Sequence, residues 1–312
     1  MFLTVTPNSA LDRVIFIDQF APETVMRTTR WVDSVGGKGF DTSVALRALG
    51  AETLAVGFMA GPTGEQLQRL LERYGIMHDL VWVEGETRTA HIIAETALGR
   101  ISHIMIGALT VSAPQVDDLL RRIDAHLPGA RWLIGGGSLP SGLSPDLFAQ
   151  TVARAHAHGV PSLLDISGPP ALAAAPAKPT ILKMNRREFC ATFDLDDIPW
   201  EALLSPAKDV AARLGLGNLV LTGGADGILA ITEQGGFHAA APHQRVVNAA
   251  GAGDAASAAL AWRLAEGDNW PSALRWAAAT GAAVVLTEGT ADCDMADIQR
   301  ILPAVHLTAL SS

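Results

Sequence analysis

Cysteine is scarce in this chain, since its 312 residues include only Cys190 and Cys293. Their spacing fits neither a disulfide framework nor a metal-binding motif. Although 49% of the residues are hydrophobic, no apolar run reaches the roughly 18 residues that a membrane-spanning helix requires. The N-terminus also lacks a basic segment followed by an apolar one. These absences predict a soluble, cytoplasmic protein with no membrane partner.

Basic residues are fewer than acidic ones, and the net charge is −9. Nucleic acids are usually bound by a basic surface, so this charge argues against a nucleic-acid partner. An anionic small molecule would need a local basic patch. No repeat, charge block or linker divides the sequence, and we therefore expect one domain over residues 1–312.

Short apolar or β-branched runs alternate with longer helical patterns along most of the chain. The runs LTVT, TLAVGF, RWLIGG and NLVLTGG are examples of the first kind, and GFDTSVALRALG and TGEQLQRLLERYG of the second. This alternation predicts an α/β fold with a mostly parallel central sheet and helices on both faces. Ligands of such sheets gather at the carboxyl ends of the strands, where most of the glycine-rich loops fall.

Two segments, at about 13–34 and 86–106, interrupt the alternation. RVIFIDQF and ETRTAHIIAETALGRISHIMI read as strands and a hairpin without an intervening helix. We interpret them as a small β lid, which would exclude water from a ligand cleft. Its free edge could be covered by a second subunit, which would give a homodimer. A structural insertion without a role in binding is the alternative interpretation.

The stretch NAAGAGDAASAALAW (248–262) places an aspartate inside a glycine-rich turn that opens a helix. It formally matches a dinucleotide fingerprint, but it lies far from the first strand and its aspartate would repel a pyrophosphate. Asp254 could instead accept the proton of an attacking hydroxyl group while backbone N–H groups stabilise a transferred phosphoryl group. Those N–H groups belong to Gly251, Ala252 and Gly253. A simple helix-capping role for Asp254 is the alternative.

Five motifs, in this order and spacing, resemble the ribokinase-like (PfkB) carbohydrate kinase family over nearly the whole chain. They are VGGKGFDTSVALRALG (35–50), GGSLPSGL (136–143), LKMNRREF (182–189), LTGGADGILAI (221–231) and GAGD (251–254). Each motif is weak alone, but the ordered set is specific. TPNSALD, LLDISG and GSLPSG are similar to the branch of 1-phosphofructokinases and tagatose-6-phosphate kinases. The resemblance implies a ribokinase-like fold, the cofactors ATP and Mg²⁺, and a sugar substrate that already carries one phosphate.

The resemblance also implies the site residues, position by position. The sugar hydroxyl groups would contact Asp12, Asp41 and the backbone around Gly37, and Ser138 would approach the sugar-phosphate end. The cations for the substrate's phosphate would be Arg27, Lys38 and Arg88. The nucleotide would contact Lys183, Asn185, Glu188 and a loop containing Thr222, Gly224 and Gly227. Glu188 would act through Mg²⁺ and its water molecules.

The sequence departs from the family pattern at several of these positions. Asp41 replaces the usual asparagine, KMN replaces Lys-Pro-Asn, and SHI (102–104) replaces Thr-Glu-Ile. An ionised Asp41 cannot donate a hydrogen bond and would repel a neighbouring phosphate, which puts the substrate in question. A kinase of an unphosphorylated sugar or nucleoside therefore stays open, as does a non-catalytic sensor of sugar phosphates or nucleotides. The intact Asp254 argues against the sensor.

Overall fold

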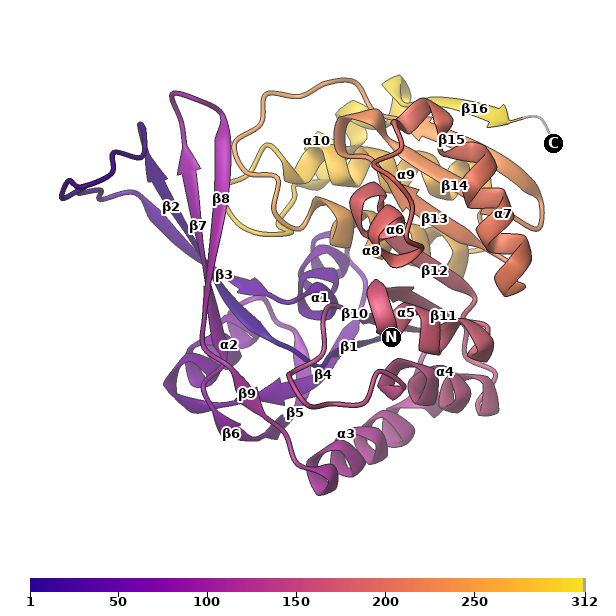
Figure 1. The fold of residues 1–312 in the computed structure, drawn as a ribbon, viewed down its shortest axis with the longest axis horizontal. Coiled ribbons are helices and arrows are strands. Elements are labelled where there is room, and N and C mark those ends of the chain that lie inside the picture. The colour runs from indigo at the N-terminus through magenta and orange to yellow at the C-terminus, as the bar shows by residue number, and fades with distance from the viewer. Residues whose placement is uncertain (311–312) are drawn as a thin grey trace.

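The computed structural model describes residues 1–310 and is built around one ten-stranded sheet (Figure 1). Its strand order is β16-β15-β14-β13-β12-β11-β10-β1-β4-β5. The strands are β1 (Phe2–Thr6), β4 (Thr53–Met59), β5 (Met77–Trp82), β10 (Trp132–Gly136), β11 (Ser162–Asp165), β12 (Ile181–Asn185), β13 (Leu219–Thr222), β14 (Ile228–Thr232), β15 (Gly235–Ala240) and β16 (His306–Leu310). Pairing is parallel from β5 to β13 and antiparallel from β13 to β16.

Helices cover both faces of this sheet. The α-helices are α1 (Lys38–Ala48), α2 (Gly61–Arg73), α3 (Ala113–His126), α4 (Leu147–Ala157), α5 (Gly168–Ala174), α6 (Arg186–Thr192), α7 (Leu204–Leu214), α8 (Ala252–Ala265), α9 (Trp270–Val284) and α10 (Met295–Ile301). Short 3₁₀ helices are η1 (Leu127–Gly129), η2 (Ala175–Ala177), η3 (Trp200–Ala202), η4 (Gly224–Asp226) and η5 (Leu302–Ala304). The predicted fold class is confirmed.

The strands are apolar on both faces because both faces are covered. Along β1, Phe2 packs in a cluster with residues of α1, α8, α9 and α10. Leu3 and Val5 point the other way, into a cluster that contains residues of α3 and α4. Since side chains alternate along a strand, a strand covered on both sides needs apolar residues at every position. This explains the short continuous apolar runs in the sequence.

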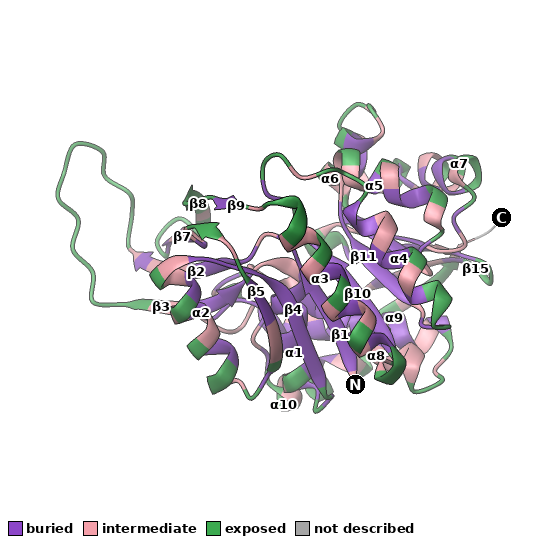
Figure 2. Cartoon of the chain, turned by 90° about the horizontal axis from the view of Figure 1, so that it is seen from below, coloured by how far each residue is buried: buried purple, intermediate pink, exposed green. Residues whose placement is uncertain are grey.

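A second sheet of four strands, which we call the lid sheet, stands at one end of the main body (Figure 1). Its order is β3 (Trp31–Gly36), β2 (Ala10–Ile17), β7 (Arg88–Glu95) and β8 (Arg100–Ile106). Two further strands, β6 (Glu84–Gly85) and β9 (Leu109–Thr110), pair at its base. Val14, Ile92 and their neighbours on one face pack against Val247 and Ala250 of the main body. Residues 18–30, between β2 and β3, form an exposed loop that projects from the molecule (Figure 2).

Of the helices in residues 1–310, none is both long enough and apolar enough to cross a membrane.

Candidate active site

The start of helix α1 forms one wall of a cavity. Gly37 precedes the helix with a positive φ of 99°, a conformation that favours glycine. A side chain on the preceding Gly36 would lie 2.2 Å from the carboxylate of Asp12, so this glycine lets the lid sheet approach the helix. Lys38 and Asp41 lie in the first turn of α1. The motif GGKGFD thus brings a cation and a carboxyl group to the cavity wall.

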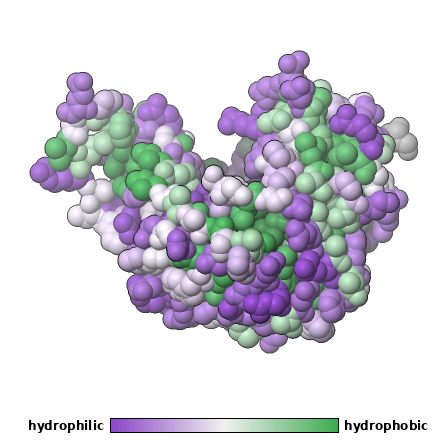
Figure 3. Space-filling view, turned by 60° about the horizontal axis from the view of Figure 1, so that its bottom comes forward, coloured by the Kyte–Doolittle hydropathy of each residue, from purple (hydrophilic) through white to green (hydrophobic). Residues whose placement is uncertain are grey.

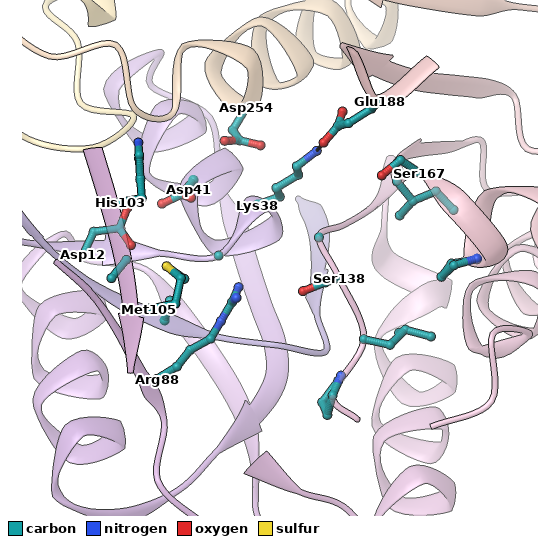
Figure 4. Close-up of a pocket in the computed structure, with 18 of the residues that line it drawn as sticks. Asp12, Lys38, Asp41, Arg88, His103, Met105, Ser138, Ser167, Glu188 and Asp254 are labelled. Carbon is teal, nitrogen blue, oxygen red and sulfur yellow. Dashed lines mark hydrogen bonds and ion pairs between the residues drawn. The ribbon is translucent and has the colours of Figure 1, made fainter. Parts of the chain in front are cut away.

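The first cavity, of about 750 Å³, lies between the lid sheet and the main body. Figure 3 shows the surface hollowed between these two parts, and Figure 4 shows the side chains that point into the cavity. We call it the sugar pocket. Its polar lining includes Asp12, Lys38, Asp41, Arg88, His103, Ser138, Ser167, Glu188, Asp254 and Thr290.

A second cavity, of about 450 Å³, lies on the far side of Lys38, and we call it the nucleotide pocket. Its polar end contains Asp165, Lys183, Asn185 and Thr222, with the glycines 224 and 227. Its other end is formed by small apolar residues of α8 and α9, among them Ala256, Ala277, Ala278, Gly281 and Ala282. Small side chains there leave a slot that a flat aromatic ring could enter.

The two cavities share the side chains of Lys38, Glu188 and Asp254. The Nζ atom of Lys38 lies 3.0 Å from Glu188 Oε1 and 2.7 Å from Asp165 Oδ1. Burial alone would lower the pKa of Lys38, but Asp165, Glu188 and Asp254 outweigh it and raise the pKa. Lys38 is therefore a permanent cation at the junction of the two cavities.

Asp165 holds two lysines at this junction in place. Its carboxylate pairs with both Lys38 and Lys183, and Ser257 also donates a hydrogen bond to it. Burial would raise the pKa of Asp165, but the two lysines lower it to about 2. Both Asp165 and Lys183 are almost completely buried, so their charges stabilise each other in place of water.

Asp254 lies in the first turn of α8, which begins after Gly251 at a positive φ of 79°. Its Oδ1 atom is buried and accepts no hydrogen bond from any residue in the described range 1–310. Burial, with a smaller contribution from the Asp165 carboxylate, raises the pKa of Asp254 to about 7 although Lys38 and Lys183 oppose the shift. A carboxyl group with this pKa can take up a proton near neutral pH.

Asp12 and Arg88 face the sugar pocket from the lid sheet. Asp12 accepts a hydrogen bond of 3.0 Å from Thr290, and burial raises its pKa to about 6 although Thr290 and Arg88 lower it. Arg88 donates to the backbone oxygen of Asn8. Its buried Nε has no partner in the part of the chain that the structure describes. The side chain of Asn8 donates a hydrogen bond to Ser138. Asn8 thus contacts both Arg88, through its backbone oxygen, and Ser138, through its side chain.

The motif NRRE forms the start of helix α6. Asn185 accepts a hydrogen bond from the N–H of Glu188, and Glu188 accepts one from the N–H of Asn185. This reciprocal capping fixes both side chains at the end of β12. Glu188 therefore caps the helix with its Oε2 atom, and its Oε1 atom accepts a hydrogen bond from Lys38.

The loop TGGADG connects the antiparallel strands β13 and β14. Gly227 has a φ of 98°, and a side chain there would lie 2.3 Å from the backbone oxygen of Ala239. The loop is thus a turn between two strands. It also lines the nucleotide pocket through Thr222, Gly224 and Gly227.

The structure brings the predicted site residues to the two cavities, with one exception. Arg27 lies in the exposed loop 18–30 and does not line the sugar pocket formed by residues 1–310 of a single chain. In a single chain Arg27 therefore lies apart from Arg88 and Lys38, and its contact with the substrate stays a prediction. Arg27 lies in the exposed loop that follows the end of β2. Sequence spacing does not reveal that this loop projects from the molecule (Figure 2).

Asn8, Asp165 and Thr290 are among the site residues that were not predicted. Asp165 ends a buried strand, in LLDISG, and a charged residue at that position signals a site at the carboxyl edge of the sheet. Asn8 stands in TPNSALD. Thr290 follows α9 and meets Asp12 only through the tertiary fold, so no local signal could have identified it.

The residues at the junction fit a magnesium ion that is held mainly by phosphate oxygens and water. No group of three or more His, Cys, Asp or Glu side chains that could hold a metal ion occurs in the described residues. Mg²⁺ usually keeps several water molecules and needs only one or two carboxylates. Glu188 and Asp165 supply such carboxylates on the nucleotide side.

Comparison with known proteins agrees with this geometry. The model of the pfkB family of carbohydrate kinases matches residues 6–297. The D-tagatose-1-phosphate kinase of Bacillus licheniformis is 31% identical over 298 residues, which cover 95% of this chain and 96% of the relative. The 1-phosphofructokinase of Xanthomonas campestris is 32% identical over 266 residues, or 84% of this chain and 83% of the relative. Phosphofructokinase-2 of Escherichia coli, solved in complex with potassium, superposes with a TM-score of 0.87 at 25% identity and covers 97% of this chain and 98% of its own.

Proposed function

The chain belongs to the pfkB family of carbohydrate kinases and is an ATP-dependent kinase, and on this premise we propose that its substrate is a ketohexose monophosphate. Fructose 1-phosphate and tagatose 1-phosphate are the substrates we favour, because a 1-phosphofructokinase and a D-tagatose-1-phosphate kinase are among the relatives. The observation that carries the proposal is the pair of cavities that meet at Lys38, Glu188 and Asp254. A phosphoryl group passing from one cavity to the other has to cross this junction.

Asp254 is the general base in this proposal. Its unpartnered Oδ1 accepts the proton of the attacking sugar hydroxyl while the oxygen of that hydroxyl bonds to the γ-phosphorus and the bond to ADP breaks. The first N–H groups of α8, from Gly251 to Gly253, have no partners within the helix and face the developing negative charge. Lys38 adds a fixed positive charge at the same place.

Lys183, Asn185 and Glu188 hold the phosphate end of ATP in the nucleotide pocket, with the loop from Thr222 to Gly227 along it. Glu188 would hold Mg²⁺ through water molecules, and the ion would neutralise charge on the transferred phosphoryl group. The alanine-lined slot between α8 and α9 accepts the adenine ring. Each part of the nucleotide thus meets a surface of matching polarity.

The phosphate that the sugar already carries binds at the opposite end of the sugar pocket. Arg88 offers an unpartnered, buried Nε–H there, the sole unused guanidinium donor of this kind in the described residues. Ser138 lies within hydrogen-bond distance of Asn8, whose backbone holds Arg88 in place. A buried arginine donor without a partner is costly unless a ligand satisfies it.

The outer face of the lid sheet supports a homodimer. Strand register places Trp31, Ile93 and Ile104 on the face opposite to the packed residues Val14 and Ile92. Trp31 is 53% exposed and Ile104 51%. A concentrated apolar face on a small sheet fits a second copy of the same lid, since a two-fold interface pairs a patch with itself.

The substrate is tested by comparing kcat/KM for a ketohexose monophosphate and for the free ketohexose. Two charge-assisted hydrogen bonds, at roughly 1.5–3 kcal/mol each, predict a preference for the phosphorylated sugar of about a hundredfold or more. Arg88→Ala should remove most of this preference and leave the KM for ATP nearly unchanged. Arg121→Ala, at an exposed position on α3, is the matched control and should keep the preference.

An unphosphorylated sugar is the second candidate, because four carboxyl groups and only two lysine or arginine side chains line the sugar pocket. Equal efficiency on the two sugars, or an Arg88→Ala variant with its preference intact, would favour that candidate. A lack of ATP consumption with every sugar would favour the sensor.

A further inference from the structure

Among the carboxyl groups of the sugar pocket, Asp41 has the weakest set of hydrogen bonds and neighbouring cations to stabilise its ionised form. It is only 4% exposed and lies in the first turn of α1. Its Oδ1 atom is buried, and the described residues supply no hydrogen bond to it. Figure 4 shows Asp41 between Asp12 and Asp254, with its carboxyl group toward the cavity.

The groups that face Asp41 come from four other elements or their ends. They are Asp12 on β2, Arg88 on β7, Asp254 on α8 and Tyr74 after α2, together with the backbone N–H of Gly37. Burial and the carboxylates of Asp12 and Asp254 raise the pKa of Asp41 well above its ordinary value. The N–H of Gly37 and the guanidinium of Arg88 favour the ionised form but are outweighed.

Its two neighbours have partners that Asp41 lacks. Asp12 accepts a hydrogen bond from Thr290. Asp254 lies near Lys38 and Lys183, which favour its carboxylate. When three carboxyl groups share one cavity, the proton stays on the group whose charge is least compensated. That group is Asp41.

We propose that Asp41 acts in the sugar pocket as a neutral carboxylic acid that donates its proton in a hydrogen bond to an oxygen atom of the sugar. This inference rests on the proposed function, since it needs a sugar in this pocket. It makes Asp41 a specificity residue for a sugar with a hydroxyl or carbonyl oxygen at this position. A carboxylate could only accept a hydrogen bond there, whereas the acid provides the donor that an asparagine side chain would provide.

The neutral form has two consequences for the site. A hydroxyl group that accepts a hydrogen bond from Asp41 keeps its own proton available for the carboxylate of Asp12, which orders the direction of the bonds around the sugar. The neutral form also removes one negative charge from a cavity that receives an anionic substrate. The negative charge then lies on Asp254, whose carboxylate accepts the proton in the proposed reaction.

The protonation state is measured without any substrate. At about pH 8, above the pKa values of Asp12 and Asp254, infrared spectroscopy of the wild-type protein should show the carbonyl band of a protonated carboxyl group. Asp41→Asn should abolish this band, and Glu65→Gln, which changes an exposed carboxylate on α2, is the control and should keep it. Absence of the band in the wild-type protein, or its persistence in Asp41→Asn, would overturn the proposal.

Thermal stability gives a second readout that needs no ligand. The unfolded chain releases the Asp41 proton near the ordinary aspartate pKa while the folded chain retains it. The stability of the wild-type protein is therefore lost progressively as pH rises from that value toward the raised pKa. Asp41→Asn lacks this dependence, so its Tm should gain on the wild-type Tm as pH rises from about 4 to about 8. A constant difference in Tm over this range would contradict the proposal.

The donor role is measured with fructose 1-phosphate and ATP. Asp41→Asn keeps a donor and should retain kcat/KM within about twofold at neutral pH, while Asp41→Leu removes it and should lose roughly 3–10-fold, mostly in KM for the sugar. The wild-type activity should also fall at alkaline pH as Asp41 ionises, and Asp41→Asn should not show that fall. A large loss in Asp41→Asn with an unchanged pH profile would overturn the donor role.

Failure of the proposed function looks different from failure of this inference. If the wild-type protein phosphorylates no sugar phosphate, the substrate is wrong, yet the infrared band and the Tm still report whether Asp41 is neutral. If the sugar phosphate is a substrate and the band is missing, the substrate stands and the inference about Asp41 falls.

Discussion

At the scale of single residues, the site depends on how five carboxyl groups divide their charge, namely Asp12, Asp41, Asp165, Glu188 and Asp254. Asp165 is ionised because two lysines surround it, whereas burial and like charge raise the pKa of Asp254 to about 7. Residue type alone does not distinguish the two. Their different roles, as an anchor for lysines and as a proton acceptor, follow from their neighbours.

Asp254→Asn tests the proton acceptor directly. The substitution keeps the shape of the side chain and removes the base, so kcat should fall by ~10²–10⁴ while binding of MgATP and sugar persists. In the wild-type protein, kcat should rise as pH increases through about 7, because the reaction needs the deprotonated carboxylate. Stopped-flow or coupled assays between acidic and neutral pH measure both effects. A variant with more than about a tenth of the wild-type kcat would show that Asp254 is not the base.

The sequence predicted the polar residues of the site better than it predicted their partners. Asp254 and Glu188 stand in the first turns of helices, and Asp12 stands near the start of β2 in a motif that begins at the end of β1. Thr290 could not be predicted, because its contact with Asp12 joins residues 278 positions apart. The position of Arg27 could not be predicted either, because nothing in the sequence fixes the course of an exposed loop.

At the scale of elements, two helix N-termini converge on the sugar pocket. Helices α1 and α8 both begin after a glycine with positive φ, Gly37 and Gly251, and both present an aspartate from the first turn. The alternating pattern predicted α1, since a helix of this kind covers the apolar face of a parallel sheet, and the glycine-rich turn before Asp254 predicted the start of α8. It could not show that the two helices meet, because that depends on the strand order of the sheet.

Gly251→Ala should damage the start of α8. An alanine Cβ there would lie 2.3 Å from the backbone nitrogen of Ala291, so the turn has to shift, in addition to a strain of roughly 1–2 kcal/mol at positive φ. We expect a clear drop in Tm and at least a tenfold drop in kcat, measured by calorimetry and by ATP consumption. Gly267→Ala, at the other end of α8, has a φ of 90° but open space around it, and it is the control. It should lose only the strain energy and keep kcat, and an equal effect of the two variants would contradict the role of the α8 start.

At the scale of the whole molecule, the lid sheet has two unlike faces. The inner one packs on the main body and lines the sugar pocket with His103 and Met105, and the outer one exposes Trp31 and Ile104 alongside Arg100. The sequence predicted strands in both segments of the lid. It did not predict which face looks outward, because that assignment depends on the register between β2, β7 and β8.

Ile104→Glu tests whether two lids pair. A charge in the centre of an apolar interface is costly to desolvate, so the variant should sediment as a monomer at concentrations at which the wild-type protein is a dimer. Leu172→Glu, on the exposed side of α5, replaces a similarly exposed side chain away from the lid and should leave the dimer intact. A wild-type protein that sediments as a monomer at micromolar concentration would refute the lid dimer.

Helix α1 contributes Lys38 to both cavities and Asp41 to one of them. A ligand in one cavity that restrains α1 therefore also restrains the side chains of α1 that a ligand in the other cavity contacts. Any coupling between the two cavities is reciprocal. The factor by which a sugar phosphate changes the affinity for a nucleotide must equal the factor by which the nucleotide changes the affinity for the sugar phosphate. The three side chains that line both cavities are the place where such a coupling would act.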